Sequence, residues 1–464
     1  RLAIRLLNVY LEWTVDYHGV QLLRYYLLYR ALVLAMVNAI RAGQSMVQAE
    51  LHHAVQDFYN LHPYPPPVDD LEGYRQRWQD ESRRCADFYL HWPDKTYRAN
   101  LEVLVAGCGT SQAAKLALRQ PLSGVVGIDV SATSVGHTGT LKHKYGLSNL
   151  EVYQLPLERA GELASRFDKI VCTGVLHHLP NPEEGLRALR EVLKPDGAMH
   201  LMVYATYGRA GVYMLQEYCR RLGVGHTEAE IQDLAITLTA LPRGHPLARL
   251  LGESPDFRRK DGLADALLNP QDRAYTVPQL LNLIERCDLT FGRWVRQAPY
   301  LPQCGDLSRT PHSASLARLP KAEQYTAVEL FRGTMLRHSL IVYRDDGSTD
   351  CRSLRFDGDH WHDYVPIRLP ETISFQKRVP AGAAAVLINQ AHTDPDLYLP
   401  VTAQEKQWYD AIDREHTIEE ITCCTSTGDS RQRNLEGAKA FFERLWWYDQ
   451  VVFDTSRQAG NVRI

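Results

Sequence analysis

The chain has 464 residues, of which 45% are hydrophobic and 23% are charged. These proportions are ordinary for a globular protein and exclude a disordered or fibrous chain, and the length predicts two or three domains. The net charge of -3 at pH 7 offers no electrostatic attraction to nucleic acid or to an anionic membrane, so neither is predicted as a partner.

Two further features predict where the protein resides. No stretch of about 20 residues is apolar and free of charge, and Arg24 and Arg30 interrupt the apolar run at 22–40. The nine cysteines are scattered and include no Cys-x-x-Cys pair, which is typical of reduced, buried thiols. We therefore predict a cytoplasmic protein.

The N-terminal residues 1–50 have leucine, tyrosine and alanine at helical spacing, which predicts a helical arm. The segment RLLNVYLEWTVDYHGVQLLRYYLLYRALVLAMV is similar to the closing helices of bacterial aminoglycoside-phosphotransferase-like domains. The sequence lacks the nucleotide-binding and catalytic parts of such a kinase, so no kinase activity is carried over. Four prolines at 63–67 then predict an extended boundary or cap, and a helix is expected at roughly 74–89.

From Leu101 the sequence alternates strands and helices, which is typical of a parallel sheet covered on both faces. The predicted strands are LEVLVAGC, GVVGIDV, LEVYQLP, KIVCTGVL and AMHLMVYA, followed later by TFGRWVRQ and RHSLIVYRD. The last two predict a closing antiparallel hairpin. The expected fold class is α/β, with a Rossmann-like, doubly wound, mostly parallel seven-stranded sheet over 51–345. Insertions are expected at about 208–270, mostly helical, and at about 300–335.

The composition changes after residue 345, where DDGSTD is typical of a linker. The segments that follow predict a helix, a short helix, a third helix and a strand: TAQEKQWYDAID, TIEEIT, NLEGAKAFFERLWWYDQ and VVFD. This order predicts a small winged-helix-like module over 346–464, and its aromatic stripe ERLWWYD is expected to pack inside. The module is a candidate surface for a protein partner.

The motif VLVAGCGTSQ predicts a ligand-binding turn, because Gly107-Cys108-Gly109 lets the backbone turn sharply and approach a ligand. Asp129 ends the second strand about 20 residues onward, where a carboxylate can accept both ribose hydroxyls. A dinucleotide site requires a third glycine at the position that Gln112 occupies. The residues therefore favour a nucleoside ligand without pyrophosphate, and S-adenosylmethionine fits that description.

With this turn and Asp129, the run FDKIVCTGVLHHLPNPEEGLRALREVLKPDGAMHLMVYA resembles the class I S-adenosylmethionine-dependent methyltransferase family, over about residues 52–345. HPYPPP, YGRAGVYMLQEYCRRLG and PQDRAYTVPQLL are similar to a bacterial subgroup of that family, and the C-terminal module resembles, in architecture only, that of multidomain protein methyltransferases. The resemblance implies S-adenosylmethionine as cofactor and in-line methyl transfer. The acceptor, a small metabolite or a protein side chain, is not identified.

The resemblance also implies which residues bind the cofactor. The methionyl moiety would be lined by the glycine turn and the residues after it, namely Gly107, Cys108, Gly109, Thr110 and Ser111. Asp129 would hold the ribose and Val130 would lie beside the adenine. The end of the fourth strand would lie beneath the sulfonium through Thr173, Gly174 and Val175.

Three departures from the family pattern lower the expected affinity for the cofactor. Val105 stands where many members have an acidic residue, and Ser111 stands where glycine is usual. The run QLPLE displaces the acidic residue near the adenine and leaves Glu158 as a substitute. A second hypothesis therefore stays open, a catalytically inactive methyltransferase-like binding or scaffold protein.

The candidate catalytic residues are His177, His178 and Tyr204, because they follow the fourth and fifth strands at the edge where ligands of such sheets bind. A general base is needed only if the acceptor is protonated near neutral pH. Alternatively, one histidine caps the next segment and the other packs, while Tyr204 and Tyr207 serve as core or lid aromatics. Tyr64, in the proline-rich segment, is expected either to close over the cofactor or to form a rigid strap.

No metal site is predicted. His360 and His362, in DGDHWHDY, are spaced like metal ligands on a strand, with aspartates nearby. A second cluster that would complete such a site is not evident in the sequence, so a polar loop is the preferred interpretation.

Overall fold

The computed structural model describes residues 30–31, 33–37, 48–253, 255–346, 354–424 and 431–459. The chain divides into two compact units, residues 1–54 and residues 55–464. In the first unit, residues 30–31, 33–37 and 48–54 are helical. The rest of the predicted arm, including most of the phosphotransferase-like segment, lies outside the described residues.

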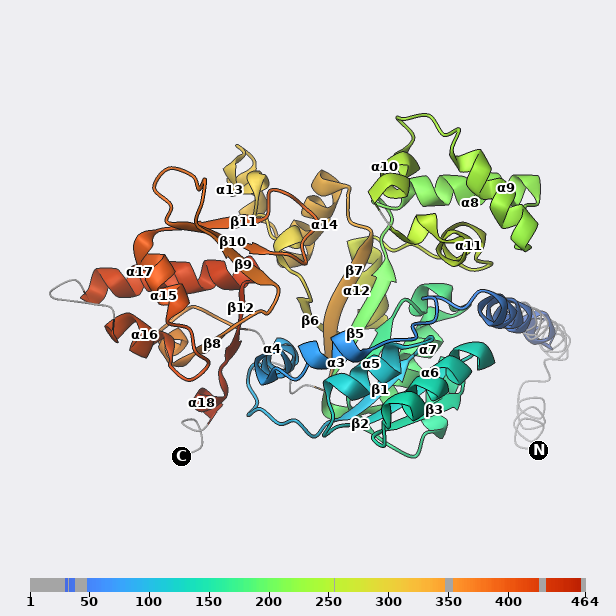
Figure 1. Ribbon diagram of the computed structural model, residues 1–464, viewed down its shortest axis with the longest axis horizontal. Helices are drawn as coiled ribbons and strands as arrows, with labels where there is room; N and C mark the ends of the chain where they lie inside the picture. The colour runs from blue at the N-terminus through green and yellow to red at the C-terminus, as the bar shows by residue number, and fades with distance from the viewer. Residues whose placement is uncertain are drawn as a thin grey trace, which may run out of the picture. The chain divides into compact units, whose positions relative to one another are not determined.

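The second unit contains a seven-stranded sheet in the order β3-β2-β1-β4-β5-β7-β6 (Figure 1). Its strands are β1 (Glu102–Ala106), β2 (Gly124–Asp129), β3 (Leu150–Gln154), β4 (Phe167–Thr173), β5 (Leu193–Tyr204), β6 (Leu289–Trp294) and β7 (Arg337–Arg344). Strands β1 to β5 pair in parallel, whereas β7 runs antiparallel to both β5 and β6. The predicted mostly parallel sheet and its closing antiparallel pair are confirmed.

Both faces of the sheet are covered. Successive side chains of a strand point to opposite faces, and in β1 Val103 and Val105 belong to one buried core while Leu104 and Ala106 belong to the other. The helices of this region are α3 (Glu72–Arg77), α4 (Glu81–His91), α5 (Gln112–Arg119), α6 (Ala132–Tyr145), α7 (Pro182–Val192), α12 (Val277–Arg286), α13 (Ser313–Ala317) and α14 (Lys321–Arg332). Short 3-10 turns are η1 (Leu157–Glu162), η2 (Leu176–His178), η4 (Ala298–Tyr300) and η5 (Asp306–Arg309).

Two boundaries differ from the prediction. The single helix expected at 74–89 is two helices, because α3 ends before Trp78 and Asp80 caps α4 by accepting a hydrogen bond from the Ser82 amide. Helix α7 ends at Val192, and β5 already begins at Leu193. The strand thus starts five residues before the predicted AMHLMVYA, which begins at Ala198, because Pro195 disfavours the helical conformation at Lys194 and the helix ends ahead of it.

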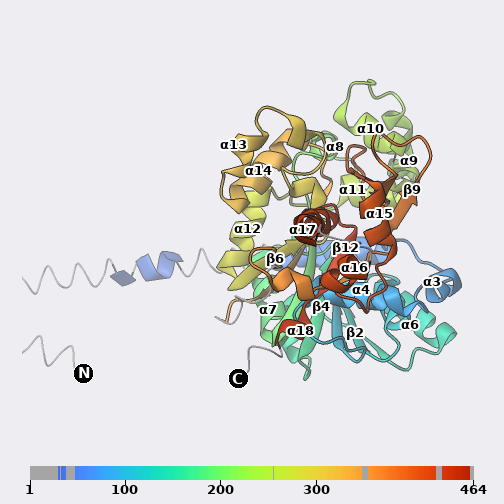
Figure 2. The same cartoon turned by 90° about the vertical axis from the view of Figure 1, so that its left-hand side faces the viewer.

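The predicted insertion forms a helical subdomain with its own buried core. Its elements, grouped together in Figures 1 and 2, are α8 (Ala210–Leu222), α9 (Glu228–Leu238), α10 (Pro246–Glu253), η3 (Pro255–Arg258) and α11 (Lys260–Leu268). The chain leaves and rejoins the sheet at one place, because Ala205 forms a β-bridge with Tyr275. Two backbone hydrogen bonds reinforce the bridge, from the Tyr275 amide to the Tyr204 carbonyl (2.9 Å) and from the Thr206 amide to the Tyr275 carbonyl (3.1 Å).

The C-terminal region contains the three predicted helices and the predicted final strand. These elements are α15 (Ala403–Asp410), α16 (Ile418–Cys424), α17 (Arg431–Trp447) and β12 (Val451–Asp454), with α18 (Ser456–Ala459) after them. Not predicted were η7 (His360–Asp363), β8 (Val365–Arg368), β9 (Thr372–Phe375), β10 (Ala385–Asn389) and β11 (Tyr398–Val401). Strands β11, β10 and β9 form one sheet, and β12 pairs with β8 in another. The linker at DDGSTD lies mostly outside the described residues, and the boundary at 346 stays a prediction.

Residues from β8 and β12 pack against the central sheet, since Ile367 and Val452 share a buried core with Val103. The Tyr89 hydroxyl of α4 donates to Asp454 Oδ2 at 2.8 Å. None of the described helices combines the length and the apolarity that a membrane crossing requires.

A buried ionic cluster lies between α4 and the sheet. Asp87 pairs with Arg119 and with Lys169, whose Nζ lies 2.9 Å from Asp87 Oδ2. Its backbone carbonyl bonds His91 Nδ1 at 2.7 Å, and the ring of His91 lies 6.2 Å from that of His200. Burial raises the pKa of Asp87, but Arg119 and Lys169 outweigh it and lower this pKa. Burial, helped by Lys169, lowers the pKa values of both histidines.

We expect the protein to lose stability as the pH falls below about 6.5, the ordinary pKa of histidine. Burial lowers the pKa of His200 to about 3, so the folded chain keeps this ring neutral while the unfolded chain binds a proton. The resulting penalty is negligible at pH 7.5, grows as the pH falls through 6.5, and reaches about 1.4 kcal/mol at pH 5.5 for His200 alone. Urea unfolding at pH 7.5 and pH 5.5 measures it. His200→Gln should reduce the difference by about that amount, and an unchanged difference would contradict the assignment.

Candidate functional site

The carboxyl ends of β1, β2 and β4 meet at one edge of the sheet, beside the point where the strand order reverses. Strand β1 lies between β2 and β4, so the connections after β1 and after β4 diverge to opposite sides. Ligands of open α/β sheets bind in the crevice at this position. The predicted ligand-binding residues follow these strands and are therefore gathered at one edge.

The glycine turn has the backbone geometry that was predicted for it. Gly107 and Gly109 have φ angles of +72° and +52°, which favour glycine. The amides of Gly107 and Cys108 both donate to the Ile128 carbonyl at 2.9 Å. A β-carbon at Gly107 would lie 2.1 Å from Cγ2 of Val175. Only glycine therefore lets the ends of β1 and β4 approach this closely.

Asp129 connects the end of β2 to the glycine turn. Its Oδ2 accepts a hydrogen bond from the Gly109 amide at 2.8 Å, and its Oδ1 accepts one from the Ser131 amide at 2.9 Å. Burial raises the pKa of this carboxyl, against the opposing effect of these backbone bonds. Each carboxylate oxygen has a second lone pair, so Asp129 retains the capacity to accept two more hydrogen bonds.

The proline-rich segment lies directly over the glycine turn. A β-carbon at Gly109 would lie 3.4 Å from Cδ of Pro65 and 3.6 Å from the Tyr64 carbonyl oxygen. The Thr110 hydroxyl donates to the Pro65 carbonyl at 2.8 Å. Tyr64 was expected either to close over the cofactor or to form part of a rigid strap. These backbone contacts are typical of a rigid strap.

The other predicted cofactor residues line the same edge. The Val130 carbonyl accepts hydrogen bonds from Gln56 and Gln154, both at 3.1 Å. The Thr173 hydroxyl accepts one from Gln112 Nε2 at 2.7 Å. Gly174 has a φ of +81°, and Cys108 is buried, which raises the pKa of its thiol.

Two buried oxygens near these elements have no hydrogen-bond partner among the described residues. One is Ser111 Oγ, at the start of α5 directly after the glycine turn. The other is Glu158 Oε2, in η1 after β3. A buried polar atom without a partner is unfavourable, so both are candidates to contact a polar ligand. Glu158 thus stays a candidate substitute for the acidic residue of the family.

The three candidate catalytic residues form one aromatic group, in which both histidines are buried and Tyr204 is partly buried. The ring of His177 lies 4.1 Å from that of His178 and 4.0 Å from that of Tyr204. Burial lowers the pKa of His177 far below its ordinary value, helped by His178 and Arg209, so its ring is neutral at pH 7. Burial and Asp265 raise the pKa of Tyr204, which therefore keeps its proton.

The sequence analysis did not predict several polar residues that surround this group. Asp265 Oδ1 accepts a hydrogen bond from the Tyr59 hydroxyl at 2.9 Å, and its Oδ2 accepts one from the Tyr204 hydroxyl at 3.4 Å. The guanidinium of Arg209 lies 3.5 Å from the centre of the Tyr204 ring and pairs with Asp272 at 3.4 Å. The sequence did contain one sign that Asp265 is buried, because its neighbours Leu263, Ala264, Ala266 and Leu267 are apolar. The structure shows all four to be buried.

The remaining candidates lie elsewhere. Tyr207 is 40% exposed and is not part of the buried group. His360 and His362 belong to η7 of the C-terminal region, where the His362 ring lies 4.1 Å from that of Trp361. The structure therefore brings together the predicted residues that follow β1, β2, β4 and β5, and leaves these three outside.

Comparison with known proteins identifies the domain that carries this site. A methyltransferase domain model matches residues 104–199. An uncharacterized protein of Synechococcus sp. is 33% identical over 257 residues, 51% of this chain and 58% of that protein. The ubiquinone biosynthesis O-methyltransferase of Acinetobacter baylyi is 25% identical over 142 residues, 29% of this chain and 59% of its own. The matches thus span less than two thirds of either relative.

Two further comparisons agree. The trans-aconitate 2-methyltransferase of Deinococcus radiodurans is 28% identical over 198 residues, 38% of this chain and 73% of that enzyme. Among solved structures, PKMT2 from Rickettsia typhi superposes with a TM-score of 0.58 and 16% identity, covering 84% of this chain and 77% of that one. A complex of that protein with AdoHcy gives the same TM-score. This likeness shows a shared fold that extends well beyond the residues matched by the domain model.

Proposed function

Through its domain at 104–199 the chain belongs to the class I S-adenosylmethionine-dependent methyltransferase family, and on that premise we propose that it transfers a methyl group from S-adenosylmethionine to an acceptor. The observation that carries the proposal is the bond between the Asp129 carboxylate and the Gly109 amide. It joins the glycine turn to the only carboxylate in the predicted cofactor set. Ribose hydroxyls would donate to the remaining lone pairs of Asp129.

The residues present fit this cofactor. Gly107 and Gly109 keep side chains out of the turn, where the methionyl part would lie. Ser111 Oγ and Glu158 Oε2 are buried acceptors without a partner among the described residues, available to an amino group. Gln112 stands where a dinucleotide site requires glycine, so a pyrophosphate is disfavoured.

The acceptor would lie between the sheet edge and the helical subdomain, beside the group of His177, His178 and Tyr204. When bound, S-adenosylmethionine supplies an electrophilic methyl group and its own leaving group. The chain's task is then to align the attacking atom with the methyl carbon. Tyr204 stays protonated and donates its hydroxyl proton to Asp265, so its oxygen can accept a hydrogen bond from a hydroxyl or amino group of the acceptor and orient it.

Incubation of the full chain with methyl-labelled S-adenosylmethionine and fractionated bacterial extract tests the proposal. We expect label in one fraction, and separation by size distinguishes a small metabolite from a protein side chain. Glu151→Ala, on the exposed side of β3, is the matched control and should transfer label as the unchanged chain does. Binding of S-adenosylmethionine without transfer of label in any fraction would instead support the inactive scaffold protein. Binding of a dinucleotide in place of S-adenosylmethionine would contradict both hypotheses.

A further inference from the structure

Three potential metal ligands converge at the predicted catalytic group, and two of them belong to it. They are His177 and His178, in η2 after β4, and Asp272, which follows α11 of the helical subdomain. One ligand atom from each residue lies within 4.8 Å of the other two. No metal ligand was predicted here because Asp272 lies far along the chain from the histidine pair and only the fold brings them together.

The side chains of His177 and Asp272 have coordinating atoms that form no hydrogen bond with any described residue. His177 is fully buried, and neither of its ring nitrogens has a hydrogen-bond partner among the described residues. The Asp272 side chain is only 1% exposed, and its Oδ1 likewise has no hydrogen-bond partner among the described residues. A neutral imidazole has one nitrogen lone pair, and a carboxylate oxygen has lone pairs as well. His177 and Asp272 Oδ1 therefore each offer a lone pair to a metal ion in the interior.

His178 Nδ1 and Asp272 Oδ2, the atoms that would not bind the metal, are held by hydrogen bonds, as is usual for metal ligands. His178 Nδ1 lies 2.6 Å from the Gln271 carbonyl oxygen. A carbonyl only accepts, so Nδ1 carries the proton and Nε2 of the neutral ring has the lone pair. Asp272 Oδ2 accepts hydrogen bonds from Gln216 Nε2 at 2.9 Å and from Arg209 at 3.4 Å. Such outer contacts orient ligands toward an ion.

We propose that His177, His178 and Asp272 bind one divalent first-row transition-metal ion, of the zinc or iron class. Two imidazoles and one carboxylate suit these ions, whereas Mg²⁺ prefers oxygen ligands. Ligand bonds of about 2.0–2.2 Å place the donors of a tetrahedral ion roughly 3.5 Å apart, so the three side chains close on the ion by small rotations. Three protein ligands leave an open position for an oxygen or nitrogen of a small molecule.

Titration of the chelator-treated full chain with Co²⁺ tests the proposal without any methyl acceptor, so its outcome is independent of methyl transfer. We expect one Co²⁺ per chain, with a visible absorption band, and displacement by Zn²⁺ but not by millimolar Mg²⁺. Asp272→Asn and His178→Gln should abolish the band. Gln216→Leu, which removes only an outer contact, should weaken binding about 10- to 100-fold.

The variant His360→Ala/His362→Ala is the matched control, because it removes two histidines from η7 and should leave the Co²⁺ affinity unchanged. Circular dichroism of each metal-free variant shows whether it folds. If Asp272→Asn proves misfolded, the folded Gln216→Leu and His178→Gln chains decide. Failure of the unchanged chain to bind Co²⁺, equal affinity for Mg²⁺, or undiminished binding by the folded ligand variants would each overturn the site.

Discussion

Asp129→Ala is expected to weaken binding of S-adenosylmethionine about 100-fold or more, because two hydrogen bonds from ribose to a charged acceptor are lost together. The substitution also leaves the Gly109 amide without the partner that holds the glycine turn. Both effects act on the same ligand, one directly and one through the backbone. Isothermal titration calorimetry with S-adenosylmethionine and with S-adenosylhomocysteine measures the loss.

Two companion variants separate the charge of Asp129 from its shape. Asp129→Asn keeps one oxygen acceptor and should lose less affinity than Asp129→Ala. Glu151→Ala removes a carboxylate from the exposed side of the adjacent strand β3 and should bind normally. An affinity of Asp129→Ala within threefold of the unchanged chain would mean that the cofactor lies elsewhere.

The direction of the Asp129 pKa adds a pH dependence to the same measurement. Burial raises this pKa, so the carboxylate takes up a proton at a higher pH than an ordinary aspartate does. Only the ionised form accepts hydrogen bonds from both ribose hydroxyls through both oxygens. Affinity should therefore fall on the acid side sooner than the usual aspartate range would suggest.

Asp449→Ala is expected to cost about 3–5 kcal/mol in the free energy of unfolding, because it leaves a buried cation without its counter-charge. Asp449 lies between α17 and β12 and is fully buried. Its Oδ1 lies 3.2 Å from Arg293 Nη2 in β6, and its Oδ2 lies 3.0 Å from His392 Nε2. Its Oδ2 also accepts a hydrogen bond from the Ala298 amide at 3.0 Å. Asp449 therefore links the edge of the central sheet to the C-terminal strands.

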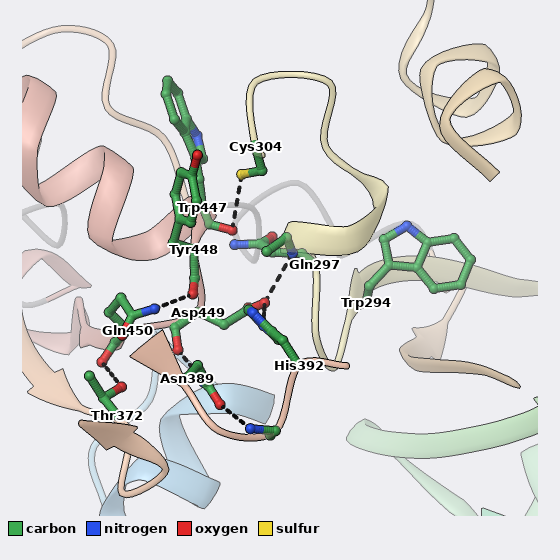
Figure 3. Close-up of polar contacts among 12 residues, drawn as sticks. Trp294, Gln297, Cys304, Thr372, Asn389, His392, Trp447, Tyr448, Asp449 and Gln450 are labelled. Atoms are coloured by element: carbon green, nitrogen blue, oxygen red, sulfur yellow. Dashed lines mark hydrogen bonds and ion pairs between the residues drawn. The ribbon is translucent and has the colours of Figure 1, made fainter. Parts of the chain in front are cut away.

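Figure 3 shows how the neighbours of Asp449 complete this network. The Asp449 carbonyl accepts a hydrogen bond from Asn389 of β10. Nearby, Gln297 Nε2 donates to the Trp446 carbonyl at 2.7 Å. The Gly305 amide donates to the Tyr448 hydroxyl at 3.0 Å. Asp449 also has a φ of +51°, a conformation that aspartate tolerates better than alanine does. The substitution thus removes charge, hydrogen bonds and a favourable backbone preference at one position.

Urea unfolding followed by tryptophan fluorescence measures the effect, and hydrogen exchange locates it. We expect faster exchange in β8, β10 and β12, with β1 and β4 less affected. Asp410→Ala, which removes an exposed ion pair with Lys406 on the surface of α15, is the matched control and should shift the midpoint little. A midpoint of Asp449→Ala equal to that of Asp410→Ala would show that the network does not hold the C-terminal strands.

The glycine turn and Asp129 could be predicted because their signals are local. A buried strand ending in Gly107 and Gly109, followed by a strand ending in Asp129, specifies the meeting of β1 and β2 through backbone geometry alone. Most helices and strands of the sheet were predictable for the same reason, since hydrophobic periodicity reports burial directly.

The polar groups around Tyr204 could not be predicted in this way. Asp265 and Tyr59 are 206 residues apart in the chain, yet their side chains bond at 2.9 Å. Asp449 likewise finds Arg293 at a separation of 156 residues. Long-range polar contacts leave no periodic trace, because a single charged residue in a helix or turn is equally compatible with a solvated face. The small strands β8 to β11 were missed, and two of them contain a proline, Pro366 in β8 and Pro400 in β11, which argues against a strand in a sequence.

The bridge between Ala205 and Tyr275 joins the two ends of the helical subdomain where they meet the sheet. Because the helical subdomain leaves and rejoins the sheet through adjacent hydrogen-bonded residues, its ends are already joined without it, and a replacement of another length would add little closure entropy. Because the acceptor is proposed to bind beside this subdomain, we expect that replacing the subdomain would change the acceptor while the strands proposed to bind the donor stay as they are. The same scaffold is thereby open to new acceptors, in evolution and in the laboratory.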